Sequence, residues 1–332
     1  MGLNEEEWQR EKERYFADVQ DFMRKRLQSQ GSASESPPQV THVQPKQTWG
    51  LASVADPNAL YVQCVNAPVD DLQFYLRVWQ QLRPGTSPLL LREDFCGSAA
   101  LCCEWVKSDP HRVAYGVDLD EATLIWGQEN HVDTLDAKGS QMRVHLLQQN
   151  VLRCDRCIPK ADLIVANNYS HFVFKTREQM IAYFTSVSLS LSPSGVFISD
   201  LYGGPEAQTV GVEDVETYRF VRTDNKETEW YTYQWEQYKY NPITHETITK
   251  IQFRFPDGSS LRDLYVYDWR LWNAPELLEM LREAGFMHAR LYMEQFDERT
   301  NESTGEYREQ ALEEFAQHTG DFWRAYIVAT LD

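Results

Sequence analysis

The stretch from Leu89 to Ala100 constrains the fold of this chain more than any other part of the sequence. An apolar run leads to the charged residues 92–94 and then to a turn of small residues at 96–99, which opens a helical pattern. A second short apolar segment ends on the carboxylate of Asp118 about twenty residues later. Strand, tight turn, helix and strand in this order are typical of a parallel α/β sheet with a ligand at its carboxyl edge.

The spacing predicts a nucleoside rather than a dinucleotide at this edge. An ionised Asp118 can accept hydrogen bonds from both ribose hydroxyls, and the small residues 96–98 let a ligand approach the backbone. A pyrophosphate prefers repeated glycines, whereas this turn has only Gly97 and is preceded by the acids Glu93 and Asp94. Two carboxylates repel a diphosphate but tolerate a cation, such as the methionine end of S-adenosylmethionine.

On these residues the chain resembles the class I S-adenosylmethionine-dependent methyltransferases, over roughly residues 60–204 and 268–331. The apolar segments 143–151, 161–166 and 323–329 follow in the order of that family's later strands. The resemblance implies an α/β fold, with a Rossmann-like, seven-stranded, mostly parallel sheet and helices on both faces. It also implies S-adenosyl-L-methionine as the cofactor, with S-adenosyl-L-homocysteine as the product.

The resemblance implies a cofactor site at the ends of the first four strands. Glu93 or Asp94 would be the acid at the end of the first strand, and Asp118 would bind the ribose. Asn150 would accept a hydrogen bond from the adenine amino group, although many relatives have Asp there. Ala99 also departs from the family, which usually has glycine at that point. The expected cofactor-binding residues are Glu93, Asp94, Phe95, Cys96, Gly97, Ser98, Asp118, Leu119, Asn150, Val151, Asn167 and Asn168.

The chemistry is expected in the polar cluster that follows the apolar run 161–166. His171 is the first candidate for a general base, because an unperturbed imidazole titrates near working pH. A structural histidine is the competing interpretation, and Tyr169 and Asp200 are the alternative bases. No metal is expected, since the pair Cys154 and Cys157 has no second ligand pair at a suitable distance.

Charge and hydropathy limit the partners. The net charge of −18 disfavours a nucleic-acid acceptor, because such binding depends on Lys and Arg that neutralise phosphates. No signal peptide or membrane-spanning run is apparent, so we expect a soluble, cytoplasmic protein that does not act at a membrane. The acceptor is expected to be a small molecule or a protein side chain, and the oligomeric state a monomer or homodimer.

Composition divides the chain into four parts. Residues 1–48 are expected to hold a charged helix at 5–29 and a flexible linker, and residues 49–204 the cofactor-binding core. Residues 205–268 contain long alternating runs that predict an inserted antiparallel sheet, either a cover for the acceptor or a dimer contact. Residues 269–332 are expected to form the C-terminal part of the methyltransferase core.

The expected function is methyl transfer from the sulfonium to a small-molecule acceptor by in-line displacement. A protein side-chain methyltransferase and a cofactor-binding pseudoenzyme or scaffold remain open. A nicotinamide-dependent oxidoreductase is disfavoured, because the turn lacks the required glycines.

Overall fold

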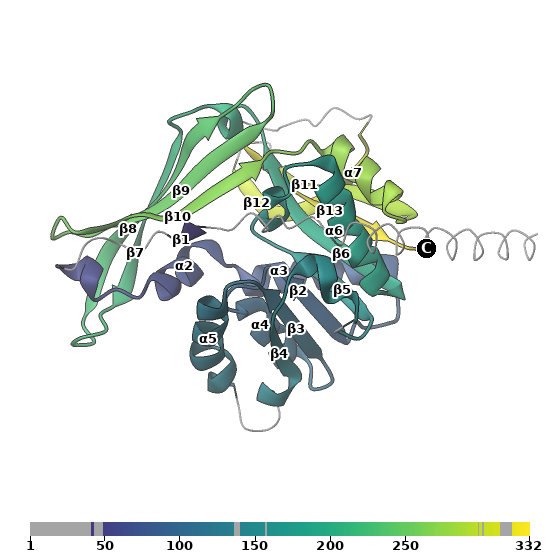
Figure 1. Cartoon of the computed structure of the whole chain (residues 1–332), viewed down its shortest axis with the longest axis horizontal. Helices are drawn as coiled ribbons and strands as arrows, with labels where there is room; N and C mark the ends of the chain where they lie inside the picture. Colours follow the sequence, from purple (N-terminus) through teal and green to yellow (C-terminus); the bar gives the residue numbers. More distant parts are fainter. Residues whose placement is uncertain are drawn as a thin grey trace, which may run out of the picture.

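The chain forms a layered α/β core with a second, smaller sheet beside it (Figure 1). The helix expected at residues 5–29, most of the linker and Cys157 lie outside the described residues. The computed structural model describes residues 41–42, 49–135, 140–156, 158–297, 299–300, 302–312 and 321–332.

The core is an eight-stranded sheet with the order β12-β11-β13-β6-β5-β2-β3-β4. The five strands from β6 to β4 run parallel, and the pairs that involve β13, β11 and β12 are antiparallel. The expected Rossmann-like sheet is therefore confirmed, with β12 as an eighth strand at the edge. The strands are β2 (Leu90–Asp94), β3 (Val113–Asp118), β4 (Val144–Gln148), β5 (Ala161–Ala166), β6 (Leu191–Gly203), β11 (His288–Phe296), β12 (Ser303–Gln310) and β13 (Trp323–Thr330).

The parallel strands end together at one edge of the sheet. Asp94, the last residue of β2, pairs with Val117 of β3 on one side and with Ala166 of β5 on the other. The residues that follow each strand therefore meet at one carboxyl edge, where open α/β sheets bind their ligands.

Helices cover both faces of the sheet, as expected. Buried residues of α3, α4 and α5 belong to one core cluster, and those of α6 and α7 to a second. The helices are α2 (Pro57–Val65), α3 (Pro68–Leu82), α4 (Ala100–Ser108), α5 (Glu121–Asn130), α6 (Arg177–Ser190) and α7 (Ala274–Glu283). Short 3-10 segments are η1 (Leu51–Ser53), η2 (Val132–Thr134), η3 (Gln141–Arg143), η4 (Val151–Arg156), η5 (Ser170–Val173) and η6 (Glu206–Gln208). No helix among the described residues combines the length and apolar character needed to cross a membrane.

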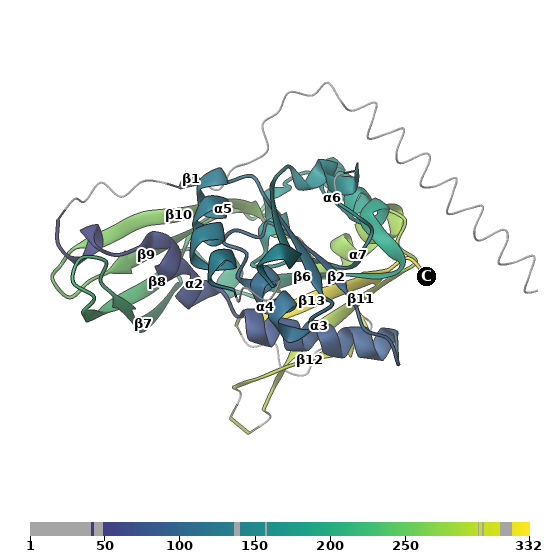
Figure 2. The same cartoon turned by 90° about the horizontal axis from the view of Figure 1, so that it is seen from below.

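The second sheet is antiparallel throughout, with the order β1-β10-β9-β8-β7, and stands to one side of the core (Figure 2). Apart from β1, it lies between β6 and α7 in the sequence, so it is an insertion into the core fold. Its strands are β1 (Thr41–His42), β7 (Glu213–Val221), β8 (Thr228–Tyr240), β9 (Glu246–Arg254) and β10 (Ser260–Arg270). One face packs aromatic side chains into the same core cluster as α6: Tyr231, Phe253, Tyr265, Tyr267 and Trp269.

Candidate functional site

The turn after β2 has an unusual backbone. Phe95, Gly97 and Ala99 all have positive φ angles, of 57°, 50° and 59°. For Phe95 and Ala99 this left-handed conformation costs roughly 1–2 kcal/mol each, because the Cβ atom crowds the following carbonyl. Such strain persists where the surrounding structure enforces it, and it is common at ligand sites.

Asp118, at the end of β3, is joined to this turn. Its carboxylate accepts hydrogen bonds from the backbone nitrogen atoms of Gly97, at 2.8 Å, and Asp120, at 2.9 Å. Burial raises the pKa of Asp118, and these N–H groups offset part of the rise. Each oxygen keeps a lone pair for a further donor. The side chain of the neighbouring Leu119 is 41% exposed at the carboxyl edge of the sheet.

Glycines set how closely the backbone segments approach one another here. A Cβ at Gly116 would lie 2.8 Å from Cys96 Sγ, and one at Gly127 would lie 2.4 Å from the carbonyl oxygen of Ser98. A Cβ at Gly97 would meet only the Thr123 methyl, at 3.9 Å. The turn is thus packed tightly against β3 and α5, at Gly116 and Gly127. Gly97 leaves its own backbone open to a ligand.

The two acids expected at the cofactor have different environments. Glu93 is buried and accepts from the backbone nitrogen and the thiol of Cys102, at 3.1 and 3.0 Å, which ties β2 to the first turn of α4. Burial raises the pKa of Glu93 to about 8.

The expected role of Asp94 at the cofactor does not fit its surroundings. Its carboxylate is fully buried and accepts hydrogen bonds from Arg92 Nε at 2.7 Å and from Arg92 Nη2 at 3.1 Å. The hydroxyl of Tyr183 donates to it at 3.1 Å. Residues 92 and 94 share a face of β2 because side chains alternate along a strand, and this face looks toward α6. We therefore assign Asp94 to the core.

Asn150 and Val151 follow β4 and are held locally. Asn150 Oδ1 accepts from the backbone nitrogen of Leu152 at 2.9 Å. The carbonyl of Val151 accepts from Arg92 at 3.2 Å and Ser186 at 2.7 Å. Both residues thus stay at the carboxyl edge, beside the end of β3 to which β4 pairs.

Asp200 organises the turn after β5. Its carboxylate accepts from the backbone nitrogen atoms of Asn168, at 2.8 Å, and Tyr169, at 2.9 Å. Both of these residues have left-handed φ angles, of 56° and 57°. Asn167 Oδ1 accepts from the hydroxyl of Tyr75. The expected residues 167–169 are thus held beside Asp200 of β6, and burial raises the pKa of Asp200 to about 8.

His171 is enclosed rather than exposed to a ligand. It is fully buried, with Nδ1 2.9 Å from Ser199 Oγ and no partner for Nε2 among the described residues. Burial lowers the pKa of His171 to about 3, so the neutral ring is a weak base. This geometry favours the structural interpretation over the general base.

Sequence reasoning missed two side chains from the helices before β2, those of Asp71 and Tyr61. Asp71 of α3 accepts from the hydroxyl of Tyr326 at 3.1 Å, and burial raises the pKa of Asp71 to about 7, with a contribution from Asp70. The charge of Asp71 contributes to the raised pKa of Asp200, and Tyr326, which donates to Asp71, pairs with Asp200 in the sheet. Burial raises the pKa of Tyr61 of α2 to about 12, with smaller contributions from the charges of Asp118 and Asp200. The sequence signal for α3 was only its amphipathic pattern, which gives Asp71 no role beyond the first helical turn.

These acids fit a cationic ligand. Among the described residues, Glu93, Asp118, Asp200 and Asp71 form no ion pair. Buried carboxyls without a cation are costly when ionised, so a bound positive charge would stabilise them. The open backbone of Gly97 and the free lone pairs of Asp118 complete a site that suits a nucleoside with a positive group.

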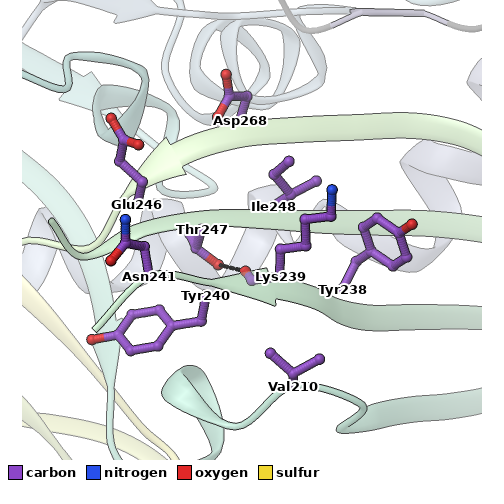
Figure 3. Close-up of a pocket in the computed structure, with 9 residues that line it drawn as sticks. All are labelled: Val210, Tyr238, Lys239, Tyr240, Asn241, Glu246, Thr247, Ile248 and Asp268. Carbon is purple, nitrogen blue, oxygen red and sulfur yellow. Dashed lines mark hydrogen bonds between the residues drawn. The ribbon is translucent and has the colours of Figure 1, made fainter. Parts of the chain in front are cut away.

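A separate hollow of about 340 Å³ lies on the inserted sheet (Figure 3). Its lining residues are spread around the end of β8 and the start of β9, with Asp268 from β10 and Val210 from the loop before β7. None of the expected site residues lines it, so it is distinct from the carboxyl edge of the core.

Comparison with known proteins identifies the fold. No protein-family model matches the sequence, and no curated protein sequence matches it. Solved structures do match. An amino pentose methyltransferase from Micromonospora echinaspora, solved with S-adenosylmethionine bound, has 16% identity and a TM-score of 0.57, over 82% of this chain and 95% of that chain.

Two further solved structures give the same result. A sugar N-methyltransferase from Streptoalloteichus sp. has 15% identity and a TM-score of 0.57, over 87% of this chain and 98% of its own. An S-adenosylmethionine-dependent methyltransferase from Clostridium acetobutylicum has 16% identity and a TM-score of 0.54, over 82% of this chain and 96% of that chain. The predicted resemblance is confirmed at the level of the fold, which is that of class I S-adenosylmethionine-dependent methyltransferases, and these neighbours support the predicted cofactor.

Proposed function

We propose that the chain is an S-adenosylmethionine-dependent methyltransferase that acts on a small molecule. The observation that carries the proposal is the half-buried carboxylate of Asp118, bonded to the open backbone of Gly97 at the carboxyl edge of a methyltransferase fold. Asp118 would hold the ribose, and Asn150 would accept from the adenine amino group. Glu93 and Asp200 would face the positive end of the cofactor.

The bound cofactor supplies an activated methyl group on a sulfonium, which is already a good leaving group. The chain must therefore align the acceptor, exclude water and remove a proton where the acceptor carries one. We assign the proton transfer to Asp200, whose pKa of about 8 is close to working pH, in preference to His171. Tyr169, the other alternative, is less suited to this role, because burial raises the pKa of its hydroxyl well above the usual value and keeps it protonated.

An amine is the acceptor group that the site favours. Asp71 and Asp200 are linked through Tyr326, and neither forms an ion pair within the described residues, so they suit an ammonium group before it is deprotonated. Two of the matched structures are described as amino pentose and sugar N-methyltransferases, which agrees with this choice for the acceptor.

A small acceptor is favoured over a protein side chain, because α2 and the aromatic face of the inserted sheet pack over this region. Leu60 of α2 and Tyr265 and Trp269 of the sheet share one buried cluster with Phe172, which follows β5. Such a cover limits access for a folded protein surface. The same features support an acceptor cover, rather than a dimer contact, as the role of the inserted sheet.

The test is transfer of a labelled methyl group from S-adenosylmethionine to separated small-molecule and protein fractions of a cell extract. The proposal expects label in the small-molecule fraction, and less of it with Asp118→Ala at a limiting cofactor concentration. Label in the protein fraction alone would favour a protein methyltransferase. Binding of S-adenosylhomocysteine without turnover on either fraction would favour the pseudoenzyme.

A further inference from the structure

Asp200 shares one face of the core sheet with polar side chains of the antiparallel strands. Tyr326 of β13 lies opposite Asp200 of β6, and Arg324 lies opposite Tyr202 in the same pairing. Side chains two residues apart on a strand point to the same face. Arg324 is therefore on the face of Asp200, one pair closer to the end of β6, at a distance of about 7 Å along the strand.

Arg324 is held at one side by a buried carboxylate. Its Nη2 atom lies 3.4 Å from Oε1 of Glu294 in β11, and the side chain of Glu294 is only 4% exposed. The hydroxyl of Ser303 donates to the same oxygen at 2.5 Å. The side chain of Arg324 is 52% exposed, and Glu294 is its one ion-pair partner among the described residues. Because a guanidinium has five N–H donors, Arg324 keeps donors for a ligand.

A second polar group beside Arg324 lacks a partner. Tyr202 is buried, and its hydroxyl has no hydrogen-bond partner in the described part of the chain. The ring of Tyr202 lies 4.5 Å from the ring of Tyr169, whose backbone nitrogen donates to Asp200. A buried hydroxyl without a partner is costly, so a ligand atom that meets it would stabilise the protein.

Opposite charges thus lie next to each other on this face. Asp71 and Asp200 suit an ammonium group, and Arg324 adds a positive charge one strand pair away. Burial raises the pKa of Tyr169 well above its usual range; the charge of Asp200 adds to the rise, and the charge of Arg324 opposes it. The guanidinium fork matches the geometry of a carboxylate or a phosphate group.

We propose that Arg324 binds an anionic group, a carboxylate or a phosphate, on the amine acceptor. This inference rests on the proposed function, and it narrows the substrate class to small molecules that carry both an amine and an anion. Asp200 faces the ammonium end and Arg324 the anionic end, so one molecule is held at two points. Such binding aligns the amine for in-line displacement. Glu294 is a positioning residue that fixes one side of the guanidinium.

The first test uses three portions of the small-molecule fraction of a cell extract, each at a concentration that limits the rate. One portion is untreated. In the second, acidic methanol converts carboxylates to esters, and in the third, phosphodiesterase and phosphatase remove phosphate groups. The wild-type chain should transfer labelled methyl to the untreated portion and at least about tenfold less to one treated portion. Loss in the second portion identifies a carboxylate, and loss in the third a phosphate.

The second test compares variants on the untreated portion. Arg324→Met should need at least about tenfold more of it for the half-maximal rate, and should bind S-adenosylhomocysteine as the wild type does. Arg324→Lys should recover part of the loss, because it keeps the charge without the fork. Glu294→Gln should stay within a few-fold of the wild type. Arg77→Met, which removes an exposed arginine 3.6 Å from Glu306, is the matched control and should have no effect.

Equal effects of Glu294→Gln and Arg324→Met would assign Arg324 to the ion pair alone and overturn the inference. Equal labelling of all three portions by the wild type would also overturn it. Arg324→Met leaves the buried Glu294 without its partner. If that variant does not fold, the double variant Arg324→Met, Glu294→Gln is compared with Glu294→Gln instead. A wild-type chain that labels none of the portions would refute the proposed function itself.

Discussion

The backbone N–H of Gly97 donates to the carboxylate of Asp118 over 2.8 Å, which joins the turn after β2 to the end of β3. One bond thus fixes the two parts of the chain that the sequence places about twenty residues apart. It orients the carboxylate while leaving lone pairs free, and it holds a glycine with open space above its backbone. The ligand site depends on this pairing.

Gly97→Ala tests whether that open space receives a ligand. The alanine must adopt a φ of 50°, which should lower the free energy of unfolding by about 1–2 kcal/mol. Affinity for S-adenosylhomocysteine should fall at least about tenfold, because the new methyl group occupies the approach to the backbone. Chemical denaturation and calorimetry measure the two effects.

Gly85→Ala provides the control for backbone strain. Gly85 lies in the loop before β2 with a φ of 78°, and a Cβ added there would have no other atom within 4 Å. This variant should lose similar stability and keep ligand affinity. Equal affinities in the two variants would exclude Gly97 from the site.

Arg92→Met tests the assignment of Asp94 to the core. It leaves a fully buried carboxylate without its bidentate partner, which typically costs about 3–5 kcal/mol of unfolding free energy. Urea denaturation should show a large fall in the midpoint. Arg222→Met, which removes an exposed pair with Asp224, should leave the midpoint near that of the wild type. A small effect of Arg92→Met would reopen a ligand role for Asp94.

Stability of the ligand-free protein should fall as the pH rises from about 6.5 to 8. Asp71, Glu93 and Asp200 have pKa values raised to about 7, 8 and 8, so the folded chain holds protons that the unfolded chain has released. His171, with a pKa lowered to about 3, opposes this trend only below its unfolded value of 6.5. Melting temperatures across this range check the sign, and a rise would contradict it.

Asp200→Asn should separate the two candidate bases. It removes the ionisable group and keeps one of the two oxygens that accept from the turn after β5, so turnover should fall about a hundredfold or more. His171→Gln should keep turnover within a few-fold of the wild type. Labelled-methyl transfer to the acceptor fraction measures both, and the reverse ranking would return proton transfer to His171.

The sequence predicts the core well because local patterns determine it. The strand-turn-helix of residues 90–108 and the apolar run of β5 need no distant partner to be recognised. Helix α7 begins where Asn273 and Glu276 form their capping contact and ends before Gly285, whose φ is 96°. Strand β12 was missed, since its mostly exposed side chains give no alternating pattern.

The site is less predictable, because burial and pairing depend on tertiary contacts. The sequence does not distinguish the adjacent acids of β2. Because side chains alternate between the two faces of a strand, Glu93 contacts α4 while Asp94 pairs with Arg92 on the other face. The enclosure of His171 by Ser199 of β6 also depends on strands meeting in space.

Calorimetric titration of S-adenosylhomocysteine into the wild type and Asp118→Ala tests the central claim most directly. Each hydrogen bond to a charged group contributes about 1.5–3 kcal/mol, so the variant should bind at least about tenfold more weakly. Glu129→Ala, an exposed acid on the neighbouring α5, should bind as the wild type does. Equal affinity in Asp118→Ala and the wild type would contradict the account.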